Sequence, residues 1–142
     1  MRYWAWRVDA PRGPAPDIKL FVLYHDPAMS PALPHSLGLQ KGLLGVVHVF
    51  ADASMRGSND TVIAHELLHT LGATDKYDLA SSKPLLPDGY AEPDRQPLYP
   101  QAFAELMGGR IPLSSTEAET PESLRKVIVG AKTASEIGWG KR

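Results

Sequence analysis

The sequence predicts a small α+β domain, and three observations lead to that prediction. Two apolar runs typical of strands, at 19–25 and 45–51, come before any helical pattern. A single amphipathic helical pattern follows and ends near residue 71. Proline-rich stretches and a second helical pattern make up the rest of the chain. Strands first and helices afterwards are typical of α+β folds rather than of alternating α/β folds.

Length, charge and cysteine content narrow the possible classes of protein. The chain has 142 residues, a formal charge of -1 and no cysteine. We expect one domain over 1–142, with an upper half at about 1–72 and a lower half at about 73–142. The near-neutral charge provides no attraction for nucleic acid or an anionic membrane, so neither is expected as a partner. Without cysteine, the chain has neither disulfides nor thiolate metal ligands. The oligomeric state is not indicated.

Three strands are expected in the upper half. The run at 19–25 is continuously apolar in its middle, as in a strand buried on both faces. The run at 45–51 reads the same way, and an aromatic cluster at 3–8 predicts an earlier strand. The prolines between residues 27 and 34 leave little room for a long helix between the strands.

The central helix has a start, an apolar face and a stop. Ser58, Asn59 or Asp60 offers an N-cap before the pattern begins. Gly72 predicts the end, because glycine adopts the left-handed conformation without a Cβ clash. Four apolar residues recur between these limits at helical spacing: Ile63, Leu67, Leu68 and Leu71.

The same helix carries a candidate metal site. His65 and His69 are four residues apart, so they project from one face and can hold one ion. Glu66 points in a neighbouring direction and can reach a water on that ion without ligating it. A chain reversal at Gly72 would return Asp75 towards the imidazoles. Three protein ligands leave the fourth zinc position open, which distinguishes catalytic from structural zinc.

Several alternatives to this site remain open. Asp78 and Glu105 are rival third ligands, and the two histidines could be incidental members of a core helix. We expect ordinary core or surface roles for the other histidines, His25, His35 and His48. A second metal such as Ca²⁺ is not expected, because the loop acids do not match a helix-loop-helix calcium pattern. These acids are Asp75, Asp78, Asp88, Glu92 and Asp94.

A C-terminal helix is expected over about 120–137. Thr120 offers a capping hydroxyl, and Pro121 suits the first helical position. A break near Gly130 would divide the segment into two shorter helices. Gly138 would stop the helix and let Trp139 fold back over the core. The apolar face consists of Leu124, Val127, Ile128 and Ala131, whereas Arg125 and Lys126 lie off it.

The string at 65–75, His-Glu-Leu-Leu-His-Thr-Leu-Gly-Ala-Thr-Asp, resembles the extended zinc motif of the metzincin metallopeptidases. It is similar to the snapalysin-like variant, in which aspartate replaces the third histidine. The resemblance implies a minimal metzincin-like domain with one catalytic Zn²⁺. A small, twisted, mostly parallel sheet and the active-site helix would lie above a cleft, with a methionine turn and a C-terminal helix below it. It also implies an endopeptidase that cleaves a peptide or protein substrate, with Glu66 activating a metal-bound water.

The family pattern is matched unevenly elsewhere. Met107, followed by two glycines, is the candidate for the methionine turn, although it also suits a flexible core filler. Many metzincins place a tyrosine shortly after that methionine, whereas here Tyr77, Tyr90 and Tyr99 all precede it. The substrate would pair with an edge strand at 36–40 or 45–51.

Two other functions remain possible from the sequence: a catalytically silent zinc-binding regulatory or interaction domain, and a domain with a purely structural zinc. No signal peptide or membrane span is recognised in the sequence, so a cytoplasmic location is expected for the chain as written. An exported or membrane-tethered protein is expected if an N-terminal segment is missing.

Overall fold

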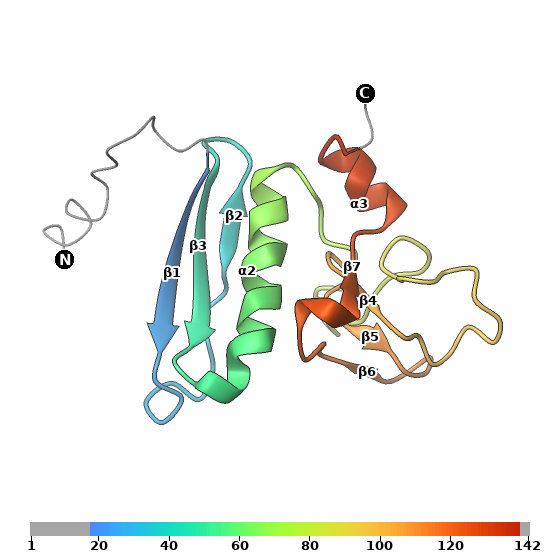
Figure 1. Cartoon of the computed structure of the whole chain (residues 1–142), viewed down its shortest axis with the longest axis horizontal. Helices are drawn as coiled ribbons and strands as arrows, with labels where there is room; N and C mark the ends of the chain where they lie inside the picture. Colours follow the sequence, from blue (N-terminus) through green and yellow to red (C-terminus); the bar gives the residue numbers. More distant parts are fainter. Residues whose placement is uncertain (1–17, 140–142) are drawn as a thin grey trace, which may run out of the picture.

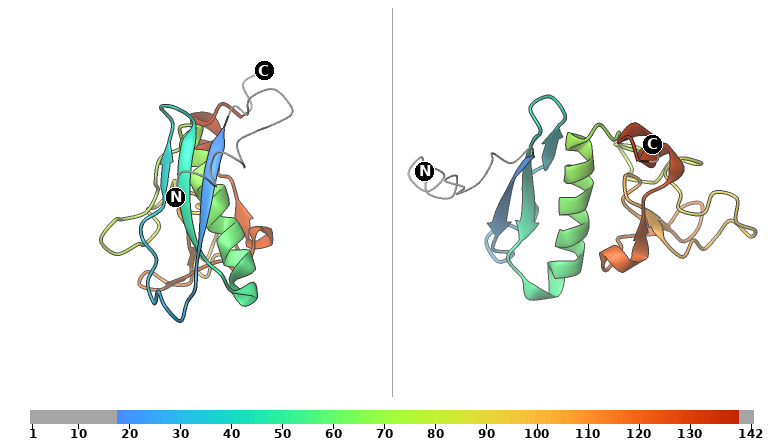
Figure 2. Two further views of the ribbon diagram at one scale, coloured as in Figure 1. Left: turned by 90° about the vertical axis from the view of Figure 1, so that its left-hand side faces the viewer. Right: turned by 45° about the horizontal axis from the view of Figure 1, so that its top comes forward.

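The computed structural model describes residues 18–139 as a mixed α+β arrangement with one main helix and small sheets (Figure 1). The main helix, α2 (Arg56–Thr70), stands between a three-stranded sheet and a loop-rich region (Figures 1 and 2). The strand predicted at 3–8 lies outside the described residues. None of the described helices is long and apolar enough to span a membrane.

The three-stranded sheet has the order β1-β3-β2. Strand β1 (Lys19–His25) is parallel to β3 (Leu44–Phe50), and β2 (Leu37–Leu39) is antiparallel to β3. The two predicted strands are confirmed, the second with a shift of one residue. The predicted mostly parallel sheet is only half right, because β2 turns straight back into β3 through residues 40–43, and a short connection joins antiparallel neighbours. As expected, no long helix lies between β1 and β2.

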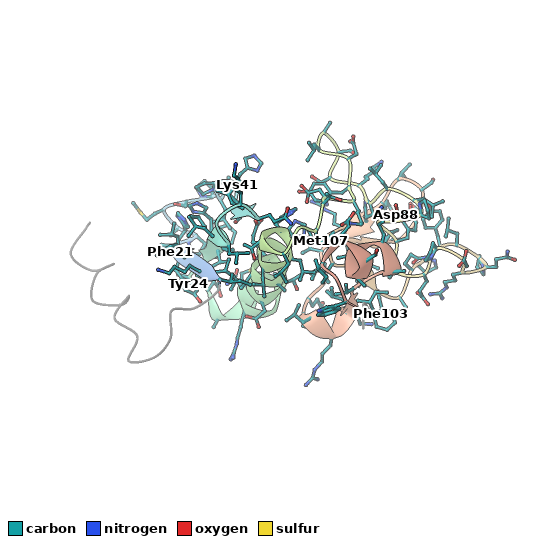
Figure 3. The ribbon with its side chains drawn as sticks, turned by 90° about the horizontal axis from the view of Figure 1, so that it is seen from above. Phe21, Tyr24, Lys41, Asp88, Phe103 and Met107 are labelled. Atoms are coloured by element: carbon teal, nitrogen blue, oxygen red, sulfur yellow. The ribbon has the colours of Figure 1, made fainter. Side chains whose placement is uncertain are left out.

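Helix α2 covers only one face of this sheet. Val47 and Val49 of β3 are fully buried on the covered face. The prediction that β1 is buried on both faces is wrong, since Phe21 and Leu23 are 42% and 45% exposed on the other side. Figure 3 places Phe21 and Met107 on opposite sides of α2. The helix is therefore supported on two sides by different parts of the chain.

The start of α2 differs from the prediction, whereas its end does not. Asp52 accepts a hydrogen bond from the Ser54 backbone and caps the 3-10 turn η1 (Ala53–Met55), which runs directly into α2. Asn59 is therefore inside the helix, and its side chain bonds the backbone N–H and C=O of Phe50 instead of capping. Gly72 follows the last turn with φ 102°, as predicted.

The predicted helix over 120–137 is wrong for most of its length. The turn η2 (Leu124–Lys126) is followed by strand β7 (Val127–Ile128), and only α3 (Ala131–Glu136), after the predicted break at Gly130, is α-helical. The β-branched pair of β7 aligns with β4 (Ala104–Glu105), and this distant pairing overrides the helical pattern. Trp139 is 60% exposed and does not cover the core.

The loop-rich side has its own small core. Strands β5 (Ile111–Pro112) and β6 (Ala118–Glu119) form an antiparallel pair there. Met107 lies in a turn, as predicted, and is fully buried. Its core cluster also contains Leu68, Ala73 and Leu106, with Ala64, Leu71, Val127, Val129 and Ile137 packed around it. Helix α2 thus joins this core to the sheet.

Candidate metal centre

Three side chains converge where α2 ends. His65 Nε2 lies 3.0 Å from His69 Nε2, and Asp75 Oδ1 lies 3.1 Å from each of these nitrogens. Asp75 reaches this point because the chain reverses at Gly72, with the Ala73 N–H donating to the Leu68 carbonyl at 3.0 Å. Within residues 18–139, these three residues form the one group of three or more acidic, histidine or cysteine side chains that could share an ion.

Backbone carbonyls fix the orientation of both imidazoles. His65 Nδ1 lies 3.0 Å from the Leu106 carbonyl, and His69 Nδ1 lies 2.8 Å from the Ala73 carbonyl. A carbonyl only accepts, so each Nδ1 carries the proton and donates it. The neutral ring then directs the lone pair of Nε2 into the cluster, which is the usual arrangement of metal-binding histidines.

This donor set fits a zinc ion. Tetrahedral zinc holds nitrogen and oxygen ligands at about 2.0–2.1 Å, which separates them by about 3.3 Å. The observed separations of 3.0 to 3.1 Å are close to that value. Two nitrogen lone pairs and a carboxylate repel one another at such distances unless a positive charge, either a metal ion or a bound proton, lies among them. Asp75 itself is one-third exposed, so the cluster opens to solvent.

The charge of Asp75 shifts the titration of its neighbours. Burial acts to raise the pKa of the Asp75 carboxyl, but when the two imidazoles are protonated, their hydrogen bonds and positive charges together bring it well below its usual range. Burial acts to lower the pKa of His69, and the bond and charge of Asp75 reverse this, so the net shift is upward. In the absence of an ion, protonation of His69 would therefore compete with metal binding.

Glu66 lies beside the cluster and has one unsatisfied oxygen. Its side chain is buried, and the Gly38 N–H of strand β2 donates to the carboxylate. The oxygen Oε2 has no hydrogen-bond partner among the described residues. Burial raises the pKa of Glu66, although His65 and His69 act in the opposite direction. A buried carboxylate oxygen without a partner is suited to hold a water or to accept a proton.

Tyr77 is the tyrosine that lies at the cluster. Its ring centroid is 6.1 Å from that of His65, and its hydroxyl donates to Asp75. Burial, followed by the charge of Asp75, raises the pKa of Tyr77 to about 12, so the hydroxyl keeps its proton near neutral pH. The other two candidates, Tyr90 and Tyr99, bond each other through their hydroxyls at 2.9 Å.

The rival third ligands lie elsewhere. Asp78 is exposed and accepts from the N–H and hydroxyl of Ser81 at 2.8 and 2.6 Å. Glu105 is fully buried, away from the cluster, and its carboxylate accepts four hydrogen bonds. The donors are Met107 N, Gly108 N, Gly130 N and Thr133 Oγ1. Of the three candidate carboxylates, the fold brings Asp75 alone to the histidines.

A hollow of about 300 Å³ adjoins Glu66 and His65. One wall comes from residues around β2 and β3, another from α2, and a third from the loop-rich side. The lining consists of Leu33, Pro34, His35, Ser36, His48, Ser58, Thr61, Val62, His65, Glu66, Tyr77, Leu106, Gly109 and Thr120. A separate hollow of about 440 Å³, near Asp52 and Arg56, shares none of the metal-cluster residues.

Sequence reasoning missed two kinds of polar contact. His25 and His48, on adjacent parallel strands, are joined Nε2 to Nδ1 at 2.8 Å. The period-2 alternation of both strands was the available signal, since it puts these residues on one face. The second kind is the anchoring of the backbone by Glu105 and Glu136, for which the sequence had no local signal. Apart from the bonds within its own turn, Glu105 has partners 25 and 28 residues away, and Glu136 has partners 60 and 62 residues away.

No known protein family, curated protein or solved structure matches this chain. The interpretation of the site therefore depends on its own geometry.

Proposed function

We propose that this chain is a zinc-dependent endopeptidase of the metzincin type, with His65, His69 and Asp75 as the protein ligands. The observation that carries the proposal is the combination of two parts. Three ligand atoms lie 3.0 to 3.1 Å from one another, and Glu66, which follows His65 on the helix, has a buried carboxylate oxygen without a hydrogen-bond partner. A hydrolytic zinc site requires both.

Zinc bound to these residues would supply a water of lowered pKa and polarise the carbonyl of a substrate peptide bond. Glu66 Oε2 takes the proton from the attacking water and then transfers it to the leaving amine. Tyr77 keeps its proton, and its hydroxyl can turn from Asp75 to donate a hydrogen bond to the negative charge that develops on the carbonyl oxygen. The hydrogen bond from Gly38 keeps the other oxygen of Glu66 in place.

The arrangement of the sheet supports β2 as the strand that pairs with substrate. Strand β3 is central, with partners on both edges, whereas β2 is paired on one edge only. A peptide in extended conformation can add to the free edge of β2 by backbone hydrogen bonds. Figure 1 shows the sheet on one side of α2 and α3 on the other, and Figure 3 shows Met107 on the side away from the sheet. This arrangement is compatible with the minimal metzincin-like domain.

Neither alternative function has an observation in its favour. A structural zinc needs a fourth protein ligand, but the cluster has three within the described range 18–139. A catalytically silent domain would be expected to have lost or blocked its base, whereas Glu66 borders an open hollow.

The proposal is tested by measuring zinc content and cleavage of a peptide library for the native chain and for Glu66→Gln. We expect one zinc per chain in both proteins. Cleavage by the variant should fall by about 10³-fold, because glutamine has the same shape but cannot accept the proton. Glu119→Gln, an exposed position in β6, is the matched control and should cleave like the native chain. A Glu66→Gln protein that keeps zinc and cleaves at the native rate would contradict the mechanism.

A further inference from the structure

The loop that presents Asp75 is held by one carboxylate from helix α3. Glu136 Oε2 accepts from the Thr74 N–H at 3.0 Å and from Lys76 Nζ at 2.7 Å. Glu136 Oε1 accepts from the Thr74 hydroxyl at 3.0 Å. The two residues that flank Asp75 in the chain are thus bound to the same side chain.

This anchor is largely removed from solvent. The Lys76 side chain is 4% exposed and that of Glu136 is 17% exposed. Lys76 Nζ also donates to the Thr74 carbonyl, and its backbone N–H donates to the Met107 carbonyl at 2.9 Å. A buried ammonium needs a nearby negative charge, so the Lys76 side chain favours the ionised form of Glu136.

The anchor and the metal cluster lie on opposite sides of the loop. The side chains of Thr74 and Lys76 reach Glu136, whereas the side chain between them, Asp75, reaches the two histidines. Successive side chains along this loop therefore point in opposite directions. Fixing the two flanking residues therefore directs Asp75 into the cluster.

We propose that Glu136 is a positioning residue for the metal centre, acting through Thr74 and Lys76 to hold Asp75 at the two histidines; this rests on the proposed zinc site. With the loop fixed beforehand, metal binding does not have to order it. Residues that orient metal ligands typically change metal affinity by about 10- to 100-fold when they are replaced.

The first test is the zinc dissociation constant of the full chain, measured by competition with a chelator. Glu136→Gln should raise it by about 10- to 100-fold. Glu92→Gln is the matched control, because Glu92 also accepts from a cation, Arg95, and from a backbone N–H, that of Ala102, each at 3.0 Å. Glu92 is not part of the metal cluster, so its replacement should leave the constant within about twofold. Equal constants for Glu136→Gln and the native chain would overturn the proposal.

A second variant keeps the test valid if Glu136→Gln does not fold, since that change leaves the Lys76 charge buried. Thr74→Val removes one hydroxyl from the anchor and retains the Lys76 pair. We expect the zinc dissociation constant to rise by about threefold to tenfold, roughly the effect of one lost hydrogen bond. Thr116→Val, which removes an exposed hydroxyl with a partner in Ser114, should leave it unchanged. No difference between Thr74→Val and Thr116→Val would count against the anchor.

A double-mutant cycle distinguishes positioning from general stability. If Glu136 acts through Asp75, then Glu136→Gln should have little further effect on zinc affinity in an Asp75→Ala background. The same loss in both backgrounds would mean a merely structural role and would overturn the proposal. At saturating Co²⁺, the visible spectrum of Glu136→Gln should shift from the native spectrum towards that of Asp75→Ala; a native spectrum would contradict positioning.

These outcomes are separable from those of the peptidase test. A native chain that binds zinc but cleaves no peptide would remove the proposed activity and leave the role of Glu136 to be decided by the affinities. If the native chain cleaves peptides and Glu136→Gln has the native zinc affinity, only the positioning role of Glu136 is refuted.

Discussion

The two sides of α2 are stabilised by different means. On the sheet side, seven residues of β1 pair with seven of β3, and Val47 and Val49 fill the space below the helix. On the loop-rich side, each of the described strands has only two residues, and buried polar side chains bond the backbone. Glu105 is the clearest of these, with four donors around one fully buried carboxylate.

The cluster of His65, His69 and Asp75 lies where these two kinds of structure meet. The helix contributes two histidines and Glu66, while the loop-rich side contributes Asp75, Tyr77 and the Leu106 carbonyl. The regular pairing of β1 with β3 supports helix α2 on the sheet side. The polar anchors determine where single atoms of the loops lie, which the proposed metal coordination would require. The comparison therefore predicts that losing a polar anchor costs more than trimming an apolar contact.

The largest expected effect is from Glu105→Leu. It would leave three donors without a partner, namely Met107 N, Gly130 N and Thr133 Oγ1, whereas the Gly108 N–H keeps its bond to the Glu105 backbone carbonyl. We expect a loss of about 4 kcal/mol in the free energy of unfolding. Val47→Ala on the sheet side should lose about 2 kcal/mol. Urea unfolding of the zinc-free proteins measures both. A smaller loss for Glu105→Leu than for Val47→Ala would break the comparison.

The next effect is from Gly38→Ala, where the sheet touches the helix. A Cβ at this position would clash with the Glu66 carbonyl oxygen and would lie 2.6 Å from His69 Cβ. Strand β2 would have to move away from α2 and weaken the Gly38 hydrogen bond to Glu66. We expect a loss of about 2 kcal/mol in the free energy of unfolding, together with a lower kcat and retained zinc.

A neighbouring change in the same strand provides the control for Gly38. Leu39→Ala shortens a side chain that is 44% exposed, so it should cost less than about 1 kcal/mol. Similar losses for the two variants would mean that the close approach of β2 to α2 is unimportant.

A pH-dependent effect should come from the anchor at Glu136. Burial acts to raise its pKa, but the hydrogen bonds from Lys76 and Thr74 outweigh it and leave the pKa below its ordinary value of 4.5. A lowered carboxyl pKa contributes stability that is complete above pH 4.5 and is lost as the pH falls further. Unfolding of the zinc-free native chain and of Glu136→Gln should therefore differ at pH 7, with the difference shrinking below pH 4.5. A constant difference would contradict this role.

The smallest effect should come from a surface ion pair on the loop-rich side. Arg95 Nη1 lies 3.0 Å from Glu92 Oε2, and both side chains are 37% exposed. Arg95→Ala should change the free energy of unfolding by less than about 0.5 kcal/mol in chemical denaturation. A loss as large as that of Glu105→Leu would show that burial is not what makes the anchors important.

The sequence predicted best what depends on neighbours in the chain. The pairing of His65 with His69 and the chain reversal at Gly72 follow from local helix geometry, so both could be predicted before the fold was known. The helix start was predicted wrongly because the Asn59 side chain, a candidate N-cap, donates instead to the backbone carbonyl of Phe50, nine residues earlier.

Distant pairing explains most of the remaining differences. Val127 and Ile128 fit a helical pattern by themselves, but their alignment with Ala104 and Glu105 draws them into a strand. The Glu136 anchor connects residues 60 and 62 positions apart, and no local pattern reports such a contact. In this chain the chemical groups were visible in the sequence, whereas the contacts that hold them in place were not.

The central claim is that two imidazoles and one carboxylate hold a zinc ion with an open position. X-ray absorption at the zinc edge, recorded on the zinc-loaded native chain and on Asp75→Ala, tests it most directly. The claim predicts four nitrogen or oxygen neighbours at about 2.0–2.1 Å, two of them imidazoles, with one oxygen replaced by water in the variant and weaker binding. A third imidazole in the native chain, or identical spectra and affinities for the two proteins, would contradict it.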